Sequence, residues 1–514
     1  MTNRDTAAAW QYHNQTKHSV ASLRANRHYL DWEIKPRSFK VYPDLQPIPL
    51  PRELRPSSVA ALSALPPRVG TLSDQPVVPD LPALARVLHF CAGITRRKVY
   101  PGGEEMYFRA AACTGALYHI DLYVICGDLP GLSAGVYHFG PHNFALHQLR
   151  AGDYRGTVAD ACGLEPAVRH APVIVACTST YWRNSWKYQS RAYRHCFWDC
   201  GTLLANLLAV ASADGAPARV LCGFVDATLN RLLDLDSARE VTLALVALGH
   251  VSEPAPAASP FIPLLSLPTL PLSPREVDYP DIRAMHAASS LLTPEDVTAW
   301  HVSPPEPAAT PPPPSGSLYP LCPRADAALP ADSIDRVILR RGSARVFSHE
   351  PLRFEDLSTL LEHTGHGVAT DCGTLLSDAY VIVNAVAGLA AGTYVYRPAE
   401  RALEQLQTGA FRQQAGFLGL GQELPADAAV NLYFLCDLQP LLSCLGNRGY
   451  RVAQLDAAIR GGQLYLAAYA LGLGATGLTF FDDDVTAFFS PHAAGKSVMF
   501  LVAIGHRKRM PARA

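Results

Sequence analysis

"GVYHFGPHNFALHQLRAGDYR", residues 135–155, and "GTYVYRPAERALEQLQTGAFR", residues 392–412, are two versions of one stretch of sequence. They share Gly, Tyr, Pro, Ala-Leu, Gln-Leu, Gly and Arg at matching places, at an offset of 257 residues (392 minus 135). In each version, glycine bounds two short apolar runs that meet at a proline, a pattern that favours a hairpin. Because a repeat supplies every later motif with a counterpart, it decides how the whole chain is interpreted.

The same register extends over most of both copies. Seven further pairs of identical residues keep the offset of 257 without a gap: Tyr123 and Tyr380, Arg191 and Arg448, Tyr193 and Tyr450, Arg194 and Arg451, Asp199 and Asp456, Gly215 and Gly472, and Phe224 and Phe481. Near the ends, "LVALGH" at 245–250 matches "LVAIGH" at 501–506, one residue out of phase. A chain of 514 residues is also too long for one ordinary hydrophobic core. We therefore predict an N-terminal extension at 1–79, a first domain at 80–252, a linker at 253–329 and a second domain at 330–510.

The predicted linker is dense in proline, as in "SEPAPAASPFIPLLSLPTLPLSPREVDYP" and "VSPPEPAATPPPPSG". Proline removes backbone donors and blocks both helices and central strands, so we expect an extended, semi-rigid segment. Within it, "PDIRAMHAASSLLTPEDVTAWH" at 280–301 is expected to form one or two short helices.

Each copy shows the same order of elements. An apolar helical segment precedes a strand, "IDLYVIC" at 120–126 or "DAYVIVN" at 378–384, and the hairpin, a long helix and a final strand follow. In the second copy, "LDAAIRGGQLYLAAYALGLG" at 455–474 is small or apolar almost all round, which predicts a buried helix that ends at glycine. "SVMFLVAIG" at 497–505 is typical of a central strand. This order predicts an α+β fold in which helices cover a sheet.

Composition limits the classes of function. The formal net charge is −1 and 17% of residues are charged, so we expect neither a nucleic-acid partner nor a membrane surface. The twelve cysteines include no CxxC pair and no metal spacing, and the chain starts without an apolar signal region. We therefore expect a soluble, cytoplasmic protein with reduced thiols and no metal, acting on a small molecule or a neutral peptide.

Several motifs resemble those of the nitroreductase-like flavoprotein superfamily, and more narrowly its SagB-type azoline dehydrogenase branch. The motifs are "RRGSARVF" at 340–347 with "EPLRFEDLSTLL" after it, "RAAACTGALYHIDLYVI" at 109–125, "WKYQSRAYRH" at 186–195, and "YHNQTKHS" and "LDWEIKPRSFKVYP" near the start. Two residues depart from the branch pattern, since His119 stands where proline is usual and Cys113 where serine is usual. The resemblance implies mixed, mainly antiparallel sheets and FMN held at an interface between two protomers.

Each half of such an FMN site is found in a different copy. The family pattern assigns the phosphate and the ring edge to the second copy, at Arg340, Arg341, Ser343, Arg345, Gly474, Thr476, Gly477, Leu478, Arg507 and Arg509. It assigns the face of the flavin to the first copy, at Arg109, Cys113, Thr114, Gly115, Ala116 and Leu117, with Lys187 and Tyr188 beside it. Clustered cations suit a dianionic phosphate, and Gly115 lets backbone approach a flat ring.

The complementary halves are missing. "PRVGTLSD" at 67–74 and "GHVSEPAP" at 249–256 replace the basic segments in the first copy, while "TDCGTLLS" at 370–377, Cys444 and Leu445 replace the loop and the Lys-Tyr pair in the second. The resemblance therefore implies one FMN per chain, bound between the two domains of an intramolecular pseudo-dimer. We expect the second place to be empty or filled by side chains.

The resemblance implies an FMN-dependent dehydrogenase that desaturates a peptide-like intermediate, as in oxidation of an azoline to an azole. Lys187 would remove the proton and Tyr188 would position or relay it. A cyclodehydratase-type enzyme is a candidate partner, and the pseudo-dimer is free to associate further. Two other functions stay open: an NAD(P)H-dependent reductase of small aromatic compounds, and a non-catalytic scaffold. For each candidate residue a purely structural role also stays open. Lys187 would then simply be exposed, the arginines at 340–345 would form surface ion pairs, and those at 507–509 would belong to a basic tail. Arg109 and Thr114 would stabilise a turn, and Gly474 would end a helix.

Overall fold

Each half of the chain folds around a sheet of seven strands with the same topology. The computed structural model describes residues 3–65, 76–100, 102–103, 105–258, 261–301, 314–368, 370–372 and 376–508. The first sheet has the spatial order β1 (Pro47–Pro49), β6 (Ala145–Ala151), β5 (Gly135–Gly140), β4 (Ile120–Cys126), β7 (Val173–Thr180), β9 (Glu240–Leu248) and β8 (Ala218–Leu221). The second has the order β10 (Leu318–Pro320), β15 (Ala402–Thr408), β14 (Gly392–Arg397), β12 (Asp378–Val383), β16 (Val430–Cys436), β18 (Ser497–Gly505) and β17 (Gly474–Leu478).

The order of strands confirms the predicted duplication and the α+β class. Neighbouring strands in both large sheets pair antiparallel, for example Tyr123 with Ala176 in one and Tyr380 with Tyr433 in the other. The repeated stretch forms the hairpins β5–β6 and β14–β15, as expected. Each sheet also receives an edge strand from outside its predicted domain, β1 from the N-terminal extension and β10 from the linker. Both are proline-containing, and an edge is where proline is tolerated in a sheet.

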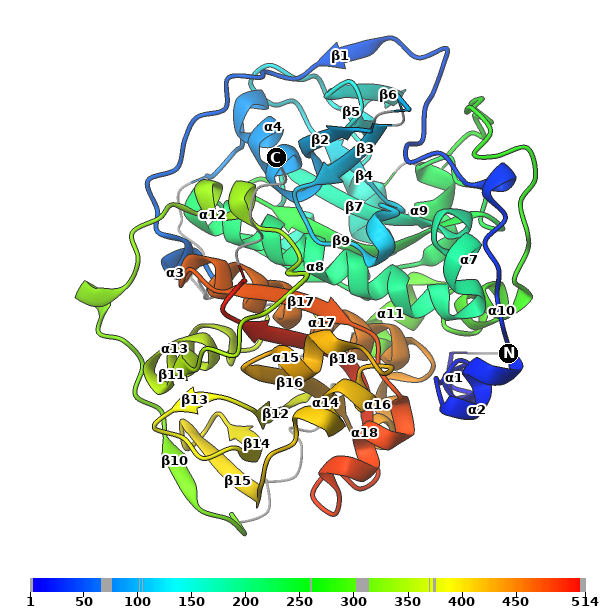
Figure 1. The fold of residues 1–514 in the computed structure, drawn as a ribbon. Helices are drawn as coiled ribbons and strands as arrows, with labels where there is room; N and C mark the ends of the chain where they lie inside the picture. Colours follow the sequence, from blue (N-terminus) through cyan, green and yellow to red (C-terminus); the bar gives the residue numbers. More distant parts are fainter. Residues whose placement is uncertain are drawn as a thin grey trace.

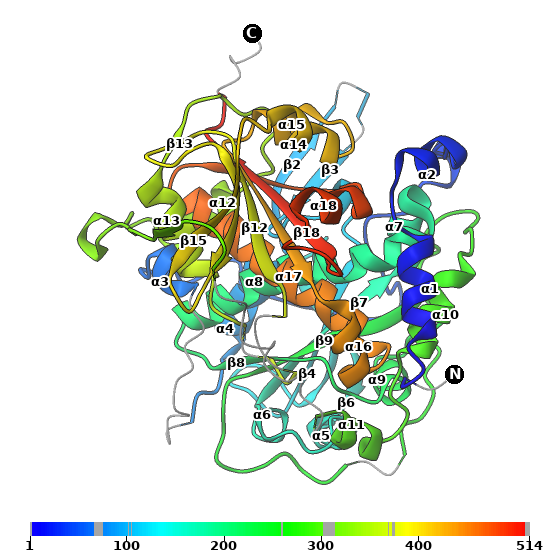
Figure 2. The ribbon, with the colours of Figure 1, turned by 90° about the horizontal axis from the view of Figure 1, so that it is seen from below.

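Two long helices, α8 (Ala192–Ala213) and α17 (Arg448–Ala470), pack against each other between the two sheets (Figures 1 and 2). Their close approach requires glycine. A Cβ added to Gly201 would lie 2.5 Å from the Cβ of Ala458, and one added to Gly462 would lie 2.6 Å from the Cβ of Ala205. At the offset of 257, Gly201 corresponds to Ala458 and Ala205 to Gly462. Equivalent positions therefore touch each other, as they do along the two-fold axis of a homodimer.

One buried ion-pair cluster joins the central helix of the first domain to the second domain. Asp482 begins α18 (Asp482–Phe489). Its carboxylate lies 3.0 Å from Arg191 Nη1 and 2.5 Å from Arg194 Nη1. All three side chains are buried. Burial alone raises the pKa of Asp482, but Arg191 and Arg194 outweigh it and hold that pKa well below its usual range.

The second cluster is the mirror of the first. Asp226 begins α9 (Asp226–Leu232) of the first domain, and its carboxylate lies 2.6 Å from Arg448 Nη1 and 2.7 Å from Arg451 Nη1. These arginines belong to the second domain, so in each cluster two arginines of one domain form ion pairs with a buried aspartate of the other. The recurring arginines are scaffold residues that hold the two halves together as an intramolecular pseudo-dimer.

The N-terminal extension and the linker wrap around the two domains (Figures 1 and 2). The extension begins with α1 (Ala7–Gln15) and α2 (Val20–Ala25), and the linker contains α10 (Pro280–Ala288) and α11 (Pro294–His301), which confirms two short helices within 280–301. The helical stretch Tyr181–Ala213 is long and apolar enough to cross a membrane, but 83% of its apolar window is buried, as in the core helix of a soluble protein.

The remaining elements cover the sheets or connect these parts. They are α3 (Ala61–Ala64), α4 (Leu81–Ala92), α5 (Arg155–Ala161), α6 (Pro166–Arg169), α7 (Tyr181–Tyr188), α12 (Ile334–Arg340), α13 (Phe354–Thr364), α14 (Arg412–Leu418), α15 (Glu423–Asp427), α16 (Leu438–Leu445), the short turns η1 (Trp32–Ile34), η2 (Thr114–Ala116), η3 (Gln189–Arg191) and η4 (Asp326–Ala328), and the strand pairs β2 (Ile94–Val99) with β3 (Glu105–Arg109) and β11 (Leu352–Arg353) with β13 (Val386–Ala387).

Candidate functional site

The loop that leads into β4 has an unusual backbone. Gly115, Ala116 and Tyr118 all have positive φ angles, of 62°, 54° and 48°. Glycine adopts such angles freely, whereas alanine and tyrosine do so at a cost in free energy. Strained backbone of this kind persists only when its surroundings fix it, and it clusters at functional sites.

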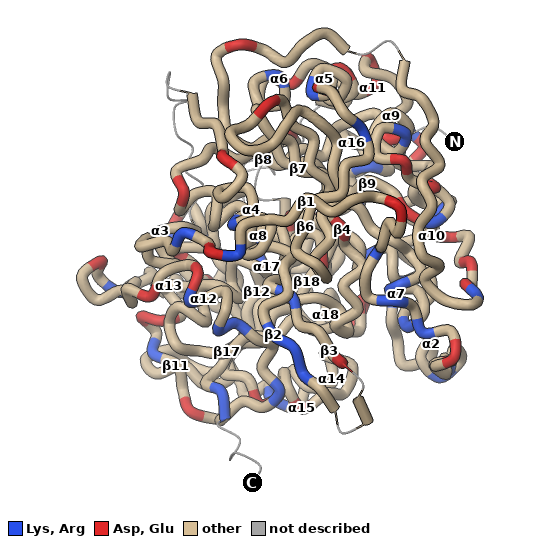
Figure 3. The backbone as a smooth tube through the Cα atoms, turned by 90° about the horizontal axis from the view of Figure 1, so that it is seen from above, with Lys and Arg blue, Asp and Glu red and all other residues tan. Residues whose placement is uncertain are grey.

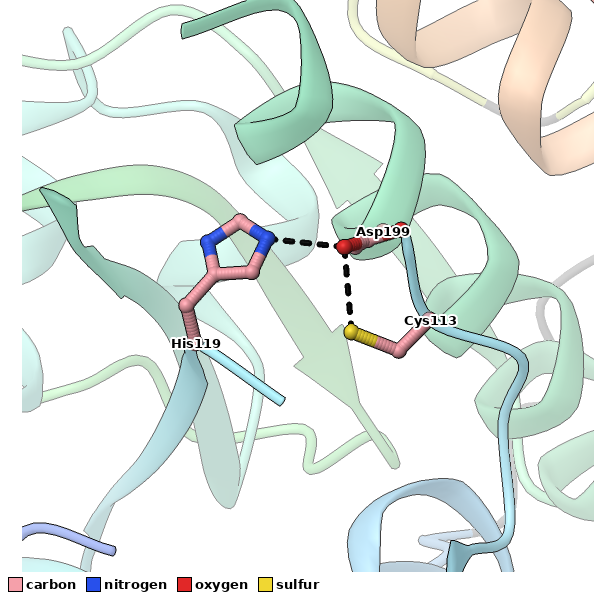
Figure 4. Close-up of side chains that lie close together, drawn as sticks. All are labelled: Cys113, His119 and Asp199. Carbon is pink, nitrogen blue, oxygen red and sulfur yellow. Dashed lines mark hydrogen bonds and ion pairs between the residues drawn. The ribbon is translucent and has the colours of Figure 1, made fainter. Parts of the chain in front are cut away.

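Asp199 of α8 fixes this loop. Its carboxylate accepts hydrogen bonds from the Thr114 backbone N–H at 2.8 Å, the Thr114 hydroxyl at 2.8 Å and the Cys113 thiol at 3.1 Å. The Nε2 of His119 lies 2.7 Å from the same carboxylate (Figure 4). Burial, and then Asp199, raise the pKa of Cys113 well above its usual range. The two departures from the branch pattern, Cys113 and His119, are therefore both used to hold Asp199.

The predicted Lys-Tyr pair lies at the C-terminal end of α7. Tyr188 is half-buried against the loop, since a Cβ added to Gly115 would lie 2.8 Å from its hydroxyl oxygen. Burial, and then Asp199, raise the pKa of Tyr188, so its hydroxyl keeps its proton at neutral pH. Lys187 is exposed, with its Nζ 5.4 Å from the centre of the Tyr188 ring. The structure thus brings Tyr188 to this loop and leaves the Lys187 side chain exposed.

Arg341 reaches from the second domain to the same loop region. Its guanidinium donates to the carbonyl of Ala110 at 2.7 Å and to that of Arg109 at 3.3 Å. Burial lowers the pKa of Arg341. Ala110 precedes the Cys113 loop by a few residues, so the arginine segment of the later half lies beside the loop of the earlier half.

The segment after Arg341 packs on the edge strand β17. Ala344 N–H donates to the Ala475 carbonyl at 2.9 Å, and Ser343 Oγ lies 3.4 Å from the hydroxyl oxygen of Tyr465. The same tyrosine hydroxyl accepts a hydrogen bond from the Gly477 N–H. Gly474, Thr476, Gly477 and Leu478 therefore form a strand at the sheet edge, next to Ser343. Gly474 also gives room to Arg507, because a Cβ at this position would collide with the arginine side chain.

Two predicted arginines are engaged elsewhere. Arg340 is bound to Asp332 at 2.5 Å and to the Tyr469 carbonyl at 2.8 Å, both within the second domain. Arg109 is buried and donates to the carbonyls of Ile120 at 3.2 Å and Ser38 at 2.8 Å, which is the turn-stabilising alternative.

The other predicted cations are at the surface. Arg345 and Arg507 are exposed, and the Arg507 guanidinium lies 4.9 Å from the centre of the Tyr469 ring. Arg509 lies outside the described residues. Leu117 is half-buried, after the strained loop, and packs on a small apolar cluster with Trp186.

Comparison with known proteins agrees with this architecture. The Nitroreductase family matches residues 88–250 and again residues 338–506. The chain belongs to the nitroreductase family. Members of this family are flavin-dependent oxidoreductases, and this chain carries the family's fold twice.

A crystal structure of a nitroreductase-like protein of Anabaena variabilis is similar over almost the whole chain. It has 25% sequence identity and a TM-score of 0.76, and the match covers 98% of this chain and 99% of that one. A nitroreductase-like protein of Methanocaldococcus jannaschii is 25% identical over 170 residues, which are 33% of this chain and 80% of that protein. The E. coli microcin synthetase McbBCD complex, with truncated pro-MccB17 bound, matches 47% of this chain and 87% of its own at 18% identity, with a TM-score of 0.30; a match this weak indicates neither substrate nor partner.

The nitroreductase-family site has features that fit FMN. Arg341, Arg345 and Arg507 place cations on the second-domain side, and Figure 3 shows more Lys and Arg along the nearby strand β2. Gly115 offers backbone without a side chain on the first-domain side. The hydroxyl of Thr479, directly after β17, is buried without a hydrogen-bond partner, and such groups in native proteins usually have one. Together these residues suit an anionic group joined to a flat, polar ring.

The pseudo-symmetric place in this nitroreductase-family chain has contacts of its own between side chains and backbone. Asp371, the counterpart of Thr114, accepts hydrogen bonds from the N–H groups of Cys222 and Gly223, each at 2.8 Å. His301 of α11 lies over Gly223, where a Cβ would approach its Nε2 to 2.6 Å. Asp371 and His301 therefore contact the backbone at Cys222 and Gly223 in the described part of this place. "PRVGTLSD" at 67–74, the counterpart of the arginine segment, lies outside the described residues.

Sequence reasoning missed two residues of the site. Asp199 was visible only as a residue repeated at Asp456, and nothing in its neighbourhood showed that it holds the loop. Tyr465 looked like one more apolar position of a buried helix, and its hydroxyl contact with β17 depends on the tertiary fold.

Proposed function

We propose that the chain is an FMN-dependent dehydrogenase of the SagB type, with one FMN bound between its two domains. The observation that carries the proposal is the contact of Arg341 with the backbone at Ala110, because it joins a cationic segment of one domain to the segment that leads into the strained loop of the other. The contacts of Asp371 with the Cys222 N–H and with His301 at the pseudo-symmetric place support a single site per chain.

In this proposal the second domain holds the phosphate and the first domain presents the reactive face. Arg341, Arg345 and Arg507 would bind the phosphate, since guanidinium forks match phosphate oxygens. Ser343 and the edge of β17 would meet the polar edge of the ring, with Thr479 as a further donor. When bound, FMN supplies a two-electron acceptor for a hydride.

The chain's own residues would handle the proton. Oxidation of an azoline to an azole removes a hydride and a proton, and molecular oxygen would take up the two electrons in the end. Tyr188 keeps its proton and lies against Gly115, so it suits positioning of the substrate by a hydrogen bond. Lys187 would accept the proton at Nζ once a substrate covers its exposed side chain, because desolvation favours the neutral amine.

The substrate class follows from this chemistry as part of the proposal. A neutral, peptide-like intermediate with a five-membered azoline ring has the two adjacent ring C–H groups that such a desaturation needs, one losing a hydride and its neighbour a proton. A cyclodehydratase-type enzyme, which forms such rings, would be the natural partner, and a cytoplasmic setting suits the reduced thiols.

A second candidate is reduction of small aromatic compounds with NAD(P)H. The observation in its favour is that Lys187 is exposed, since a base already poised for the dehydrogenase reaction would be expected in a desolvated place. The relatives that carry nitroreductase names point the same way.

Anaerobic mixing of the FMN-loaded protein distinguishes the two functions. Bleaching of the flavin absorbance by an azoline peptide, and not by NADPH, supports the dehydrogenase, whereas rapid bleaching by NADPH supports the reductase. Lys187→Met should slow bleaching by the peptide by about 10²-fold or more, the usual contribution of a general base. Lys35→Met is the matched control, because Lys35 is also exposed and also lies 5.4 Å from a neighbouring aromatic ring. Protein that stays colourless after incubation with FMN would instead indicate a non-catalytic scaffold.

A further inference from the structure

The place that corresponds by pseudo-symmetry to the proposed FMN site contains a group of metal-ligand side chains. The donor atoms of Cys222, Asp371 and Cys372 all lie within 4.8 Å of one another. The Nε2 of His301 lies 3.0 Å from the Asp371 carboxylate. We propose that Cys222, Cys372, Asp371 and His301 form a structural site for a divalent metal ion of the zinc type.

The donor set matches the chemistry of zinc. The donors that lie within 4.8 Å of one another are two thiols and one carboxylate oxygen, and His301 Nε2 lies beside that carboxylate, so a small shift of the His301 side chain would complete the four ligands of a structural zinc site. In a tetrahedron with metal–nitrogen and metal–oxygen bonds of about 2.0–2.1 Å, the nitrogen and oxygen are about 3.3 Å apart. The observed 3.0 Å between His301 and Asp371 is close to that value. Calcium and magnesium are excluded by the two sulfur ligands, because hard cations require oxygen.

The ligands are oriented by the surrounding fold. Asp371 is held by the Cys222 and Gly223 N–H groups, which direct its carboxylate while leaving lone pairs for a metal. Burial of the two cysteines and the 19% side-chain exposure of His301 leave the imidazole as the side open to an entering ion.

The position of the group gives the ion a role. Cys222 follows β8 in the first domain, His301 ends the linker helix α11, and Cys372 precedes β12 in the second domain. One ion would therefore tie both domains and the linker together at the place where a second flavin would otherwise bind.

A disulfide between the two cysteines is the competing use of this group. A disulfide would leave Asp371 paired with His301 and with the two backbone N–H groups, so metal content and a non-reducing peptide map distinguish the two uses. The group Cys113, His119 and Asp199 serves as an internal control, because it offers a single thiol rather than two.

Cobalt provides the test. The full-length protein, kept reduced, is freed of metal with a chelator and titrated with Co²⁺ while thiolate-to-cobalt absorbance is recorded. We expect about one Co²⁺ per chain with tetrahedral d–d bands, and the same stoichiometry of zinc by elemental analysis of protein purified without chelator. The Cys222→Ser/Cys372→Ser variant should lose the cobalt absorbance, and Cys113→Ser should keep it.

His301→Asn provides a second test that does not depend on correct folding of the double variant, since it removes only one ligand, at the more exposed side. It should weaken Co²⁺ binding by at least the roughly 10- to 100-fold that loss of an outer-shell partner costs, with an unchanged circular dichroism spectrum. Absence of stoichiometric cobalt, cobalt lost from Cys113→Ser instead, or a Cys222–Cys372 disulfide in a non-reducing peptide map of the purified protein would overturn the proposal. None of these outcomes depends on flavin binding or on the reaction.

Discussion

Replacing Asp482 by asparagine tests the link between the two domains. The carboxylate of Asp482 is the only one that the described structure pairs with both Arg191 and Arg194, and it also accepts a hydrogen bond from the His18 N–H at 2.8 Å. All of this lies inside the protein, where Asp482 is 2% exposed and Arg194 is fully buried. The change to asparagine keeps the size of the side chain but leaves two guanidinium groups without their counter-charge.

The expected cost follows from this burial. Removing one partner of a buried ion pair typically destabilises a protein by about 3–5 kcal/mol, because the remaining charge stays desolvated. Asparagine can still accept one hydrogen bond, so we expect a loss of about 3 kcal/mol in the free energy of unfolding. Asp483 is the matched control, since it forms an ion pair with Lys17 at 2.8 Å but its side chain is 79% exposed. Asp483→Asn should cost less than about 1 kcal/mol.

Urea unfolding followed by tryptophan fluorescence measures both changes. Trp198 is a suitable reporter because its ring centre lies 5.7 Å from the Arg191 guanidinium. Asp482→Asn should lower the urea concentration at the midpoint of the transition in which the domains separate, and Asp483→Asn should leave this midpoint unchanged. Equal small effects of both substitutions would refute the argument that reciprocal buried ion pairs hold the pseudo-dimer together.

Three more outcomes follow from the geometry. Arg341→Ala should lower the FMN retained after gel filtration by about 10-fold or more, the scale of one charge-assisted contact. Arg336 of α12 is exposed, and Arg336→Ala should leave FMN retention unchanged. Equal retention in both variants would show that Arg341 is not part of the site. Gly115→Ala should destabilise the loop by about 1–2 kcal/mol and lower FMN occupancy, because the φ of Gly115 is 62° and the new Cβ meets Tyr188. Gly215→Ala, at a φ of 71° with open space around the new Cβ, should lower stability alone. Unchanged FMN occupancy in Gly115→Ala would contradict the contact of this loop with FMN. A carboxyl with a depressed pKa stabilises the fold above its unfolded pKa of about 3.9, and this contribution is lost as pH falls through the folded pKa. Because the pKa of Asp482 is lowered, Asp482→Asn should flatten the acid side of the profile of unfolding free energy against pH. An unchanged acid side would contradict the lowered pKa.

The duplication made most of the fold predictable. A constant offset of 257 between Gly135 and Gly392, and onward through both halves, required two domains of one topology, and the two sheets have that topology. Apolar strands and the buried helix 455–474 were also readable, because periodicity and composition report directly on burial. The edge strands β1 and β10 were not, since proline-rich triplets carry no strand signal and pair only because a sheet edge is next to them.

The site was predictable in outline and less so in detail. The motif positions of Arg341 and Thr114 predicted that the two segments meet, and Arg341 bonds to the backbone four residues before Thr114. Arg340 carries the same motif signal, yet Asp332 takes its guanidinium, which only the fold reveals. Likewise, the contact of His301 with Asp371 at the pseudo-symmetric place could not be foreseen, because His301 comes from the linker rather than from either repeat.

The count of flavins per chain tests the central claim most directly. The purified protein is saturated with FMN, freed of excess by gel filtration and denatured, and the released flavin is quantified against the protein concentration. The proposed composite site between Arg341 and the Thr114 loop predicts about one FMN per chain, since Asp371 and His301 contact each other and the facing backbone at the pseudo-symmetric place. Two FMN per chain, or a single FMN whose retention survives Arg341→Ala, would contradict the division of one site between two domains.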